Sequence, residues 1–271
     1  MPRTIQARYA ATRDDIGDLR TQRPLPNAHR EQLDPFLFLN HHGPQVYPPD
    51  NRGLPFGPHP HRGFETVTFI VEGALTHKDT GGHESEIRAG GVQWMTAGRG
   101  LEHSELSSAT FLREGGPLEI LQLWINLPSR LKMTAPRYVG KQVDEIPTRE
   151  LDGATMQRIS GEEGAIESLT GVVMNTIALR SGARITLDAP RGRTVFFYIV
   201  RGTLNLGQAM ELIEFNDDGE TIEVEAHTDT LLLFGHADPI GEPVVAYGPF
   251  VMNTQEEIVQ AIHDYQRGLF R

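Results

Sequence analysis

The sequence predicts an all-β protein made of two similar barrels in tandem. Its apolar segments are short, rich in β-branched and aromatic residues, and bounded by glycine or proline, as strands usually are. The clearest of them cover residues 65–71, 92–95, 120–127, 173–179, 195–200 and 230–234. Strands do not alternate with helices, so a parallel sheet is not expected. A chain of 271 residues is long enough for two domains, each with its own core.

A repeat appears when the chain is shifted against itself by 129 positions. Residues 67–75, VTFIVEGAL, then align with residues 196–204, FFYIVRGTL. Both segments are apolar strands that end at a glycine and resume at a leucine, which two related barrels would explain. Because Pro136 follows the strand that ends near Leu127, we expect an N-terminal domain over 1–135 and a C-terminal domain over 136–271.

The two ends of the chain differ in character. Prolines are spread through residues 1–55, which favours short strands and turns over helix. Near the other end, Thr254 and Glu257 form a capping box, and Gly268 is a natural stop. One apolar stripe lies between them, formed by Ile258, Ala261, Ile262 and Tyr265. We expect a short C-terminal helix that closes the second barrel.

Composition excludes several classes of function. The net charge of −11 argues against direct binding of nucleic acid, which requires a basic face. The absence of cysteine excludes disulfides, thiolate metal sites and cysteine nucleophiles. Residues 1–17 lack the apolar core of a signal peptide, and no apolar run approaches the roughly 18 residues that a membrane span needs. We therefore expect a cytoplasmic protein, without contact to membranes, and a monomer.

Two short segments carry a metal-ligand pattern. His59 and His61 precede an apolar strand, and residues i and i+2 of an extended chain project to the same side. Pro60 keeps His59 extended, which stiffens the pair. His103 and Glu105 repeat the spacing with one imidazole and one carboxylate. Two such pairs on neighbouring strands predict one mononuclear metal site with four ligands.

Imidazole and carboxylate ligands suit several divalent transition metals: iron, manganese, nickel, cobalt, copper and zinc. Three imidazoles and one carboxylate leave one or two coordination positions for water or substrate, as a catalytic metal requires. The same four ligands could also close a purely structural zinc site. The pattern predicts the site but leaves the metal open.

Longer strings around these ligands resemble one family. The spacing Gly53-x5-His59-x-His61-x3-Glu65 resembles the first cupin motif, and Gly100-x2-His103 resembles the core of the second. The strings HPHRGFETV (59–67), QWMTAGRG (93–100) and LQLWINLP (121–128) are similar to those of the pirin family, a branch of the cupin superfamily. The C-terminal segment 253–266 is also similar, so the resemblance spans nearly the whole chain.

This resemblance implies two cupin (jelly-roll) barrels packed face to face, with one metal, usually Fe(II), in the N-terminal barrel. His59, His61, His103 and Glu105 match the metal-binding positions of the family. Glu65 stands where many other cupins have their carboxylate ligand. Because pirins use the carboxylate after the second-motif histidine, we expect Glu65 beside the ligands without contact to the metal.

The second barrel is expected to hold no metal. The shift of 129 places Asp188 and Pro190 at the positions of the first two histidine ligands, and neither can replace an imidazole. His227 and His236 are isolated in the sequence, and we expect them to be ordinary strand or loop histidines. This domain would then serve mainly as a lid and a packing partner.

The resemblance further implies an oxidoreductase of the quercetin 2,3-dioxygenase type, which opens a flavonol with O2. The metal would lower the pKa of the flavonol hydroxyl, and Glu105 could accept its proton as the catalytic residue. Phe56, Phe64 and Trp94 are candidates for an apolar wall of the site. By contrast, His77 and His83 flank a glycine pair, and we expect both in solvent.

A second function is also implied by the resemblance. Some pirins act as iron-dependent partners of transcription factors or metabolic enzymes. In that case the redox state of the metal would change the surface electrostatics and hence the affinity for a protein partner. The acidic net charge is compatible with a partner protein that binds without contact to DNA.

Overall fold

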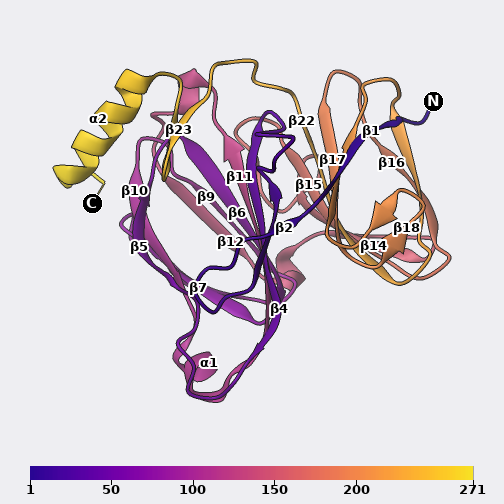
Figure 1. Cartoon of the computed structure of the whole chain (residues 1–271), viewed down its shortest axis with the longest axis horizontal. Helices are drawn as coiled ribbons and strands as arrows, with labels where there is room; N and C mark the ends of the chain where they lie inside the picture. Colours follow the sequence, from indigo (N-terminus) through magenta and orange to yellow (C-terminus); the bar gives the residue numbers. More distant parts are fainter. Residues whose placement is uncertain (271) are drawn as a thin grey trace. The chain divides into compact units, whose positions relative to one another are not determined.

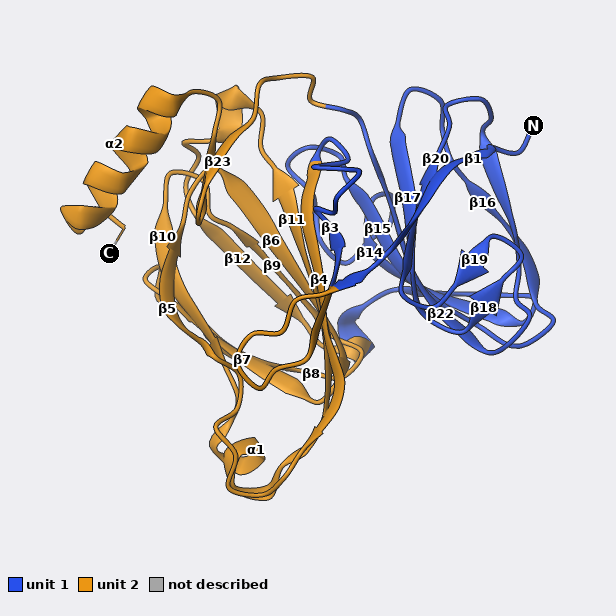
Figure 2. Cartoon of the chain, in the orientation of Figure 1, with its two compact units in different colours: residues 1–12, 23–35, 144–239 blue, residues 13–22, 36–143, 240–271 orange. Residues whose placement is uncertain are grey.

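The computed structural model describes residues 1–270 and consists mainly of antiparallel strands (Figure 1). The chain forms two compact units (Figure 2). Unit 1 contains residues 1–12, 23–35 and 144–239, and unit 2 contains residues 13–22, 36–143 and 240–271. Each unit therefore draws on separate stretches of the sequence.

Unit 2 contains a barrel of two sheets. The larger sheet has the order β12-β9-β6-β11-β4-β3-β2, and the smaller has the order β5-β10-β7-β8. The strands of the larger sheet are β2 (Thr12–Arg13), β3 (Thr21–Leu25), β4 (Phe36–Tyr47), β6 (Phe64–Glu72), β9 (Val92–Thr96), β11 (Gly116–Asn126) and β12 (Arg137–Lys141). Those of the smaller sheet are β5 (Phe56–His61), β7 (Ala74–Asp79), β8 (Glu84–Arg88) and β10 (Leu101–Leu106). One core cluster includes Ile70, Leu75, Ile87 and Ile120, which come from both sheets.

Unit 1 repeats this two-layer design. Its large sheet has the order β1-β20-β17-β22-β15-β14-β13, and two short strand pairs, β16-β21 and β18-β19, complete it. The strands of the large sheet are β1 (Ile5–Ala10), β13 (Thr148–Leu151), β14 (Ala154–Ser160), β15 (Val173–Leu179), β17 (Thr194–Arg201), β20 (Glu211–Phe215) and β22 (Thr230–Ala237). The short pairs are β16 (Arg184–Asp188) with β21 (Thr221–Glu225), and β18 (Thr203–Leu204) with β19 (Gly207–Gln208).

The predicted repeat is confirmed by the position of its two strands. In unit 2, β6 lies between β9 and β11, and in unit 1 β17 lies between β20 and β22. The glycines that follow, Gly73 and Gly202, both have φ values near +85°. A residue with a side chain rarely adopts this conformation, which explains the glycine in each copy. The all-β, two-barrel fold expected from the sequence is observed.

The division at residue 135 differs from the observed units, because each barrel takes in a segment from the far end of the chain. β1 pairs with β20 and so belongs to unit 1. From Ile240 onward the chain belongs to unit 2, where β23 (Val245–Tyr247) pairs with β24 (Phe250–Met252). Strand pairing over more than 200 residues of sequence cannot be detected from local patterns.

The C-terminal helix forms as predicted. It is α2 (Gln255–Gln266), and its Thr254–Glu257 capping box is present in both directions. The expectation that it closes the second barrel is wrong, since α2 packs against β23 and β24 within unit 2. The other helical segments are short: α1 (Ala109–Glu114), η1 (Ser129–Leu131) and η2 (Val143–Glu145). Within residues 1–270, no helix is long and apolar enough to cross a membrane.

Buried Lys132 links β24 to the connection between β5 and β6 by hydrogen bonds. Its Nζ donates to the carbonyl oxygens of Gly63 (2.9 Å) and Val251 (2.9 Å) and to Oδ1 of Asn126 (2.7 Å). Gly63 has φ +88°, and an added Cβ would lie 2.0 Å from the Val251 oxygen. The approach of β24 therefore requires glycine at this position.

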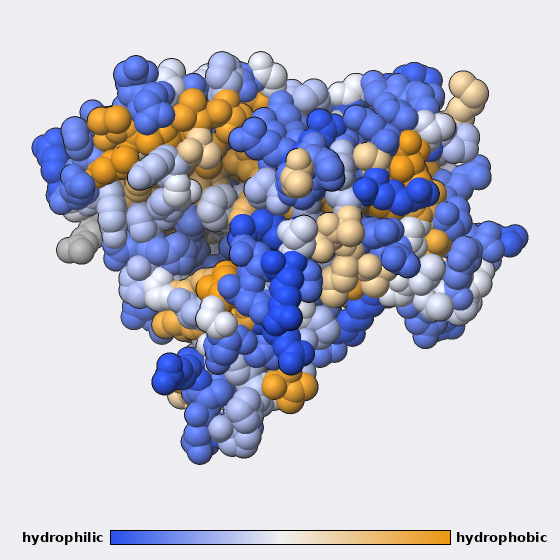
Figure 3. Space-filling model, viewed as in Figure 1, coloured by the Kyte–Doolittle hydropathy of each residue, from blue (hydrophilic) through white to orange (hydrophobic). Residues whose placement is uncertain are grey.

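On the face shown in Figure 3, hydrophobic residues form a strip beside α2.

Candidate metal centre

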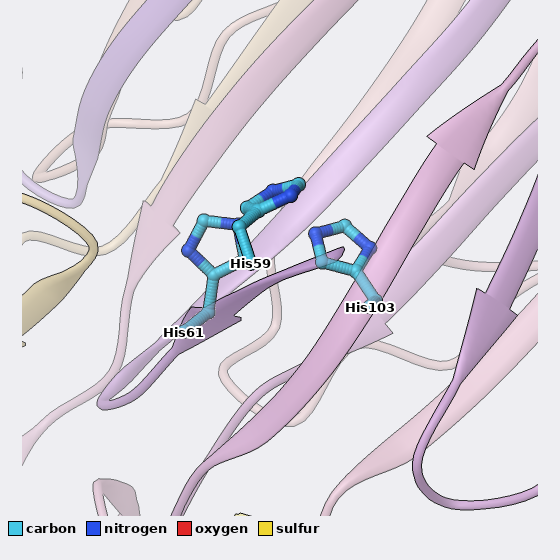
Figure 4. Close-up of side chains that lie close together, drawn as sticks. All are labelled: His59, His61 and His103. Atoms are coloured by element: carbon cyan, nitrogen blue, oxygen red, sulfur yellow. The ribbon is translucent and has the colours of Figure 1, made fainter. Parts of the chain in front are cut away.

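The structure brings His59, His61 and His103 together inside unit 2. His59 and His61 lie on β5, and His103 lies on β10 directly opposite His59 (Figure 4). Their ligand nitrogens all lie within 4.8 Å of one another. The ring centroids of His59 and His103 are 4.4 Å apart, and those of His61 and His103 are 4.9 Å apart. The i, i+2 pairing on neighbouring strands thus produces the predicted convergence of imidazoles.

The hydrogen bonds of these rings test whether a metal fits. Nδ1 of His59 donates to the carbonyl oxygen of Gly57 at 2.7 Å. The lone pair of Nε2 is then available to bind a metal. Nδ1 of His61 and both ring nitrogens of His103 are buried without a hydrogen-bond partner in the described chain. Buried polar atoms are rarely left unpaired in native proteins, so each of these needs a partner from outside the chain. One metal ion can pair with Nδ1 of His61 and with one of the two ring nitrogens of His103.

The electrostatics of the cluster support the same assignment. The pKa of His61 is lowered to about 3, chiefly by burial and also by neighbouring His59, whereas a hydrogen bond with the Pro249 backbone opposes the shift. Burial is also the main cause that lowers the pKa of His103 well below its usual value, with further contributions from the other histidines. Both rings are therefore neutral at pH 7, and the neutral imidazole is the form that binds a metal.

Glu105, the fourth predicted ligand, lies two residues from His103 on β10 but outside the cluster of three histidines. Its carboxylate is buried and accepts hydrogen bonds from Thr68 (Oγ1, 3.1 Å), Gln93 and Gln122 (Nε2, 2.6 Å). These three donors come from β6, β9 and β11 of the facing sheet. The carboxylate is therefore inside the barrel, and its role as a ligand stays a prediction.

Glu65 and Trp94 lie on the other face of the large sheet, and the expectation that they border the site is wrong. Thr68 on β6 contacts Glu105, and side chains alternate along a strand, so Glu65 points away from the cluster. Glu65 instead accepts a hydrogen bond from Thr96 at 2.6 Å and another from Trp94. Burial raises the pKa of Glu65 to about 7.

The aromatic surface beside the ligands is formed by Phe64 and Trp124. The ring of His61 lies 5.0 Å from that of Phe64 and 5.4 Å from that of Trp124, and the last two are 4.5 Å apart. Of the sequence candidates, Phe64 is thus shown to lie next to His61. Phe56 is half-buried and packs against His42 at 5.3 Å. Trp124 was missed, although it follows Gln122 at the i+2 spacing that puts both on one face.

His77 is buried beside the site, contrary to the expectation that it is in solvent. Its Nε2 is 3.0 Å from Oδ2 of Asp79, and its ring is stacked on Tyr138 at 4.1 Å and lies 5.3 Å from His103. The hydroxyl of Tyr138 in turn donates to Gln93 at 3.1 Å. His83 is exposed, as expected, and contacts Asp79. The register of β7 against β10, which pairs His77 with Glu105, explains the burial.

Two jelly-roll barrels, one of them with three converging imidazoles on neighbouring strands, define a two-domain cupin. The sequence model of the family described as Pirin matches residues 18–125, and that of the Pirin C-terminal cupin domain matches residues 174–271. The chain belongs to the pirin family.

Similar proteins are found in bacteria and animals. A Pseudomonas aeruginosa protein provisionally named as a quercetin 2,3-dioxygenase is 38% identical over 254 residues, which cover 90% of this chain and 89% of that protein. Human pirin is 37% identical over 265 residues, covering 91% and 86%. The crystal structure of quercetin 2,3-dioxygenase from Acinetobacter baumannii has a TM-score of 0.93 and 35% identity, and covers 100% of this chain and 99% of that one.

Proposed function

We propose that this chain is a metal-dependent dioxygenase that cleaves a flavonol such as quercetin. The observation that carries the proposal is the set of buried, unpartnered imidazole nitrogens of His61 and His103 beside His59. They suit one divalent transition metal, with iron as the first candidate and manganese, nickel, cobalt, copper or zinc as alternatives. The similarity to proteins named as quercetin 2,3-dioxygenases supports the choice of substrate class.

When bound, the metal would supply Lewis acidity that lowers the pKa of a substrate hydroxyl. The residues of the chain have complementary tasks. Phe64 and Trp124 offer aromatic faces against which a planar flavonol can pack. The burial of His61 and His103 would limit the access of bulk water to the reacting atoms.

Glu105 is proposed as the group that accepts the hydroxyl proton, and as a fourth metal ligand when its side chain turns toward the histidines. Hydrogen bonds from Thr68, Gln93 and Gln122 hold its carboxylate oxygens in place as acceptors. A carboxylate held in this way can serve as a general base. Moving the carboxylate would break some of these bonds, so the three donors would set the balance between the two roles. O2 would then add to the activated ring, with ring opening and loss of carbon monoxide.

The test is quercetin turnover by protein reloaded separately with iron, manganese, nickel, cobalt or copper. The loss of flavonol absorbance and the release of carbon monoxide are followed together. We expect turnover with at least one metal, its loss in His103→Ala, and its retention in His227→Ala, which changes an exposed histidine of unit 1. Absence of turnover with every metal would refute the proposal and favour the regulatory role that the family resemblance also implies.

The role of Glu105 is tested with Glu105→Gln. This change keeps the size of the side chain but removes the base, so we expect metal to be retained and turnover to fall by about 100-fold or more. If Glu105→Gln instead loses the metal, the carboxylate acts chiefly as a ligand. Unchanged turnover would contradict both roles.

A further inference from the structure

Unit 1 contains a cavity of about 460 Å³ that the proposed activity does not use. Its lining residues come from β13, β14, β15, β16 and β22 and from the connections beside them (blue in Figure 2). Asp188 and Pro190 are among them, and the 129-residue repeat matches these two positions to His59 and His61. The positions that match the first two histidine ligands thus border this cavity, but both are exposed and neither carries an imidazole.

Polar and apolar side chains share the inner part of this wall. His236 and Asn175 line the cavity and are both more than nine-tenths buried. Phe234 and Leu187 add an apolar surface. Nδ1 of His236 has no hydrogen-bond partner within residues 1–270. A buried ring nitrogen that borders a cavity and lacks a partner indicates a ligand that supplies one.

Arginine side chains lie at this cavity and next to His236. Arg149 and Arg158 line the cavity, and the guanidinium of Arg158 also donates a hydrogen bond to Glu163. Arg193 donates to the backbone oxygen of His236 at 3.3 Å and has a buried Nε without a partner among the described residues. Two acidic side chains, Asp188 and Glu162, also line the cavity. Like Arg149 they are exposed, so water screens all three charges.

The pKa of His236 is lowered to about 4, chiefly by burial and also by the charges of Arg193 and Arg3. The ring is therefore neutral at pH 7, with one N–H to donate. A carboxylate accepts hydrogen bonds from imidazole N–H, amide and guanidinium groups, which are the donors that this wall offers. A neutral aliphatic ligand would leave them unpaired.

We propose that the barrel of unit 1 is a binding site for a small carboxylic acid with an apolar body. The carboxylate would lie against His236 and Asn175, and the apolar part against Phe234 and Leu187. The cavity volume falls within the range of about 300–1,000 Å³ that is usual for small-molecule sites. This function is separate from the chemistry of the histidine cluster in unit 2.

Benzoate is the probe, added to the metal-free full-length protein and followed by correlation spectra of the histidine imidazoles. We expect a saturable shift of the His236 resonances, whereas those of exposed His227 in the same unit stay unchanged. Benzyl alcohol has the same ring without the charge, and should bind about tenfold more weakly or worse. Because no metal is present, this result is independent of dioxygenase activity.

Two substitutions localise the site. His236→Leu and Asn175→Leu should each weaken benzoate binding by about tenfold or more, while Arg184→Ala, on β16 but outside the cavity lining, should bind as the wild type does. Should a leucine variant fail to fold, the wild-type spectra still decide the question. The proposal is overturned if His236 shows no saturable shift at millimolar benzoate, or if benzoate shifts only His61 and His103.

Discussion

Acidification of the metal-free protein should destabilise unit 2 through His61. The folded-state pKa of His61 is about 3, whereas an unfolded histidine titrates near 6.5. Between these two values the unfolded chain binds more protons than the folded one, so stability rises with pH and is lost as the pH falls. From pH 6.5 to pH 4.5 the loss from His61 alone is about 2 kcal/mol. His103 shifts in the same direction and adds to it.

The assay is denaturant unfolding followed by tryptophan fluorescence. Both tryptophans of the chain, Trp94 and Trp124, lie in unit 2, so the signal reports that unit without a contribution from unit 1. His61→Phe is the matched control, because it keeps a ring beside Phe64 and Trp124 and removes the titrating group. The wild type should lose about 2 kcal/mol more than His61→Phe over this range. Equal pH dependence in the two proteins would refute the assignment of His61 as a buried neutral ligand.

Two further predictions concern the attachment of the C-terminal segment to unit 2, and the same fluorescence assay checks both. Lys132→Met should cost about 1–3 kcal/mol at pH 7.5, since it leaves buried acceptors without a donor. Burial lowers the pKa of Lys132 to about 8. The stability of the wild type should therefore rise relative to that of the variant by about 2 kcal/mol between pH 7.5 and 9.5. A stability difference that stays constant over this range would contradict the prediction. Gly63→Ala should destabilise far more than Gly17→Ala, because both glycines have positive φ but only an added Cβ at Gly63 meets backbone, the Val251 oxygen. Equal losses of stability in these two variants would show that the close approach of β24 does not require glycine at position 63.

The features that could be predicted from the sequence are those that depend on residues close together along the chain. The i, i+2 spacing of His59 and His61 depends only on extended backbone, and the capping box of α2 depends on residues three apart. The central strands β6 and β17 are recognisable because each contains a mainly apolar run and is followed by a glycine.

The features that could not be predicted depend on which strands pair and in which register. Glu65 has the cupin spacing, yet its face is decided by the neighbours of β6, which place Thr68 toward Glu105 inside the barrel and Glu65 on the opposite face. His77 next to a glycine turn looks exposed until β7 is paired with β10. The exchange of chain ends between the units has the same origin, since β1 finds its partner β20 about 200 residues away.

The most direct test of the central claim is a metal titration of the metal-free protein by calorimetry with Mn(II) or Ni(II), supported by elemental analysis of protein purified without added metal. A site built on the three histidines should bind one metal ion per chain in the wild type and in His227→Ala, and none in His103→Ala. Binding that survives the loss of His103, or a wild type that binds no divalent metal, would contradict it.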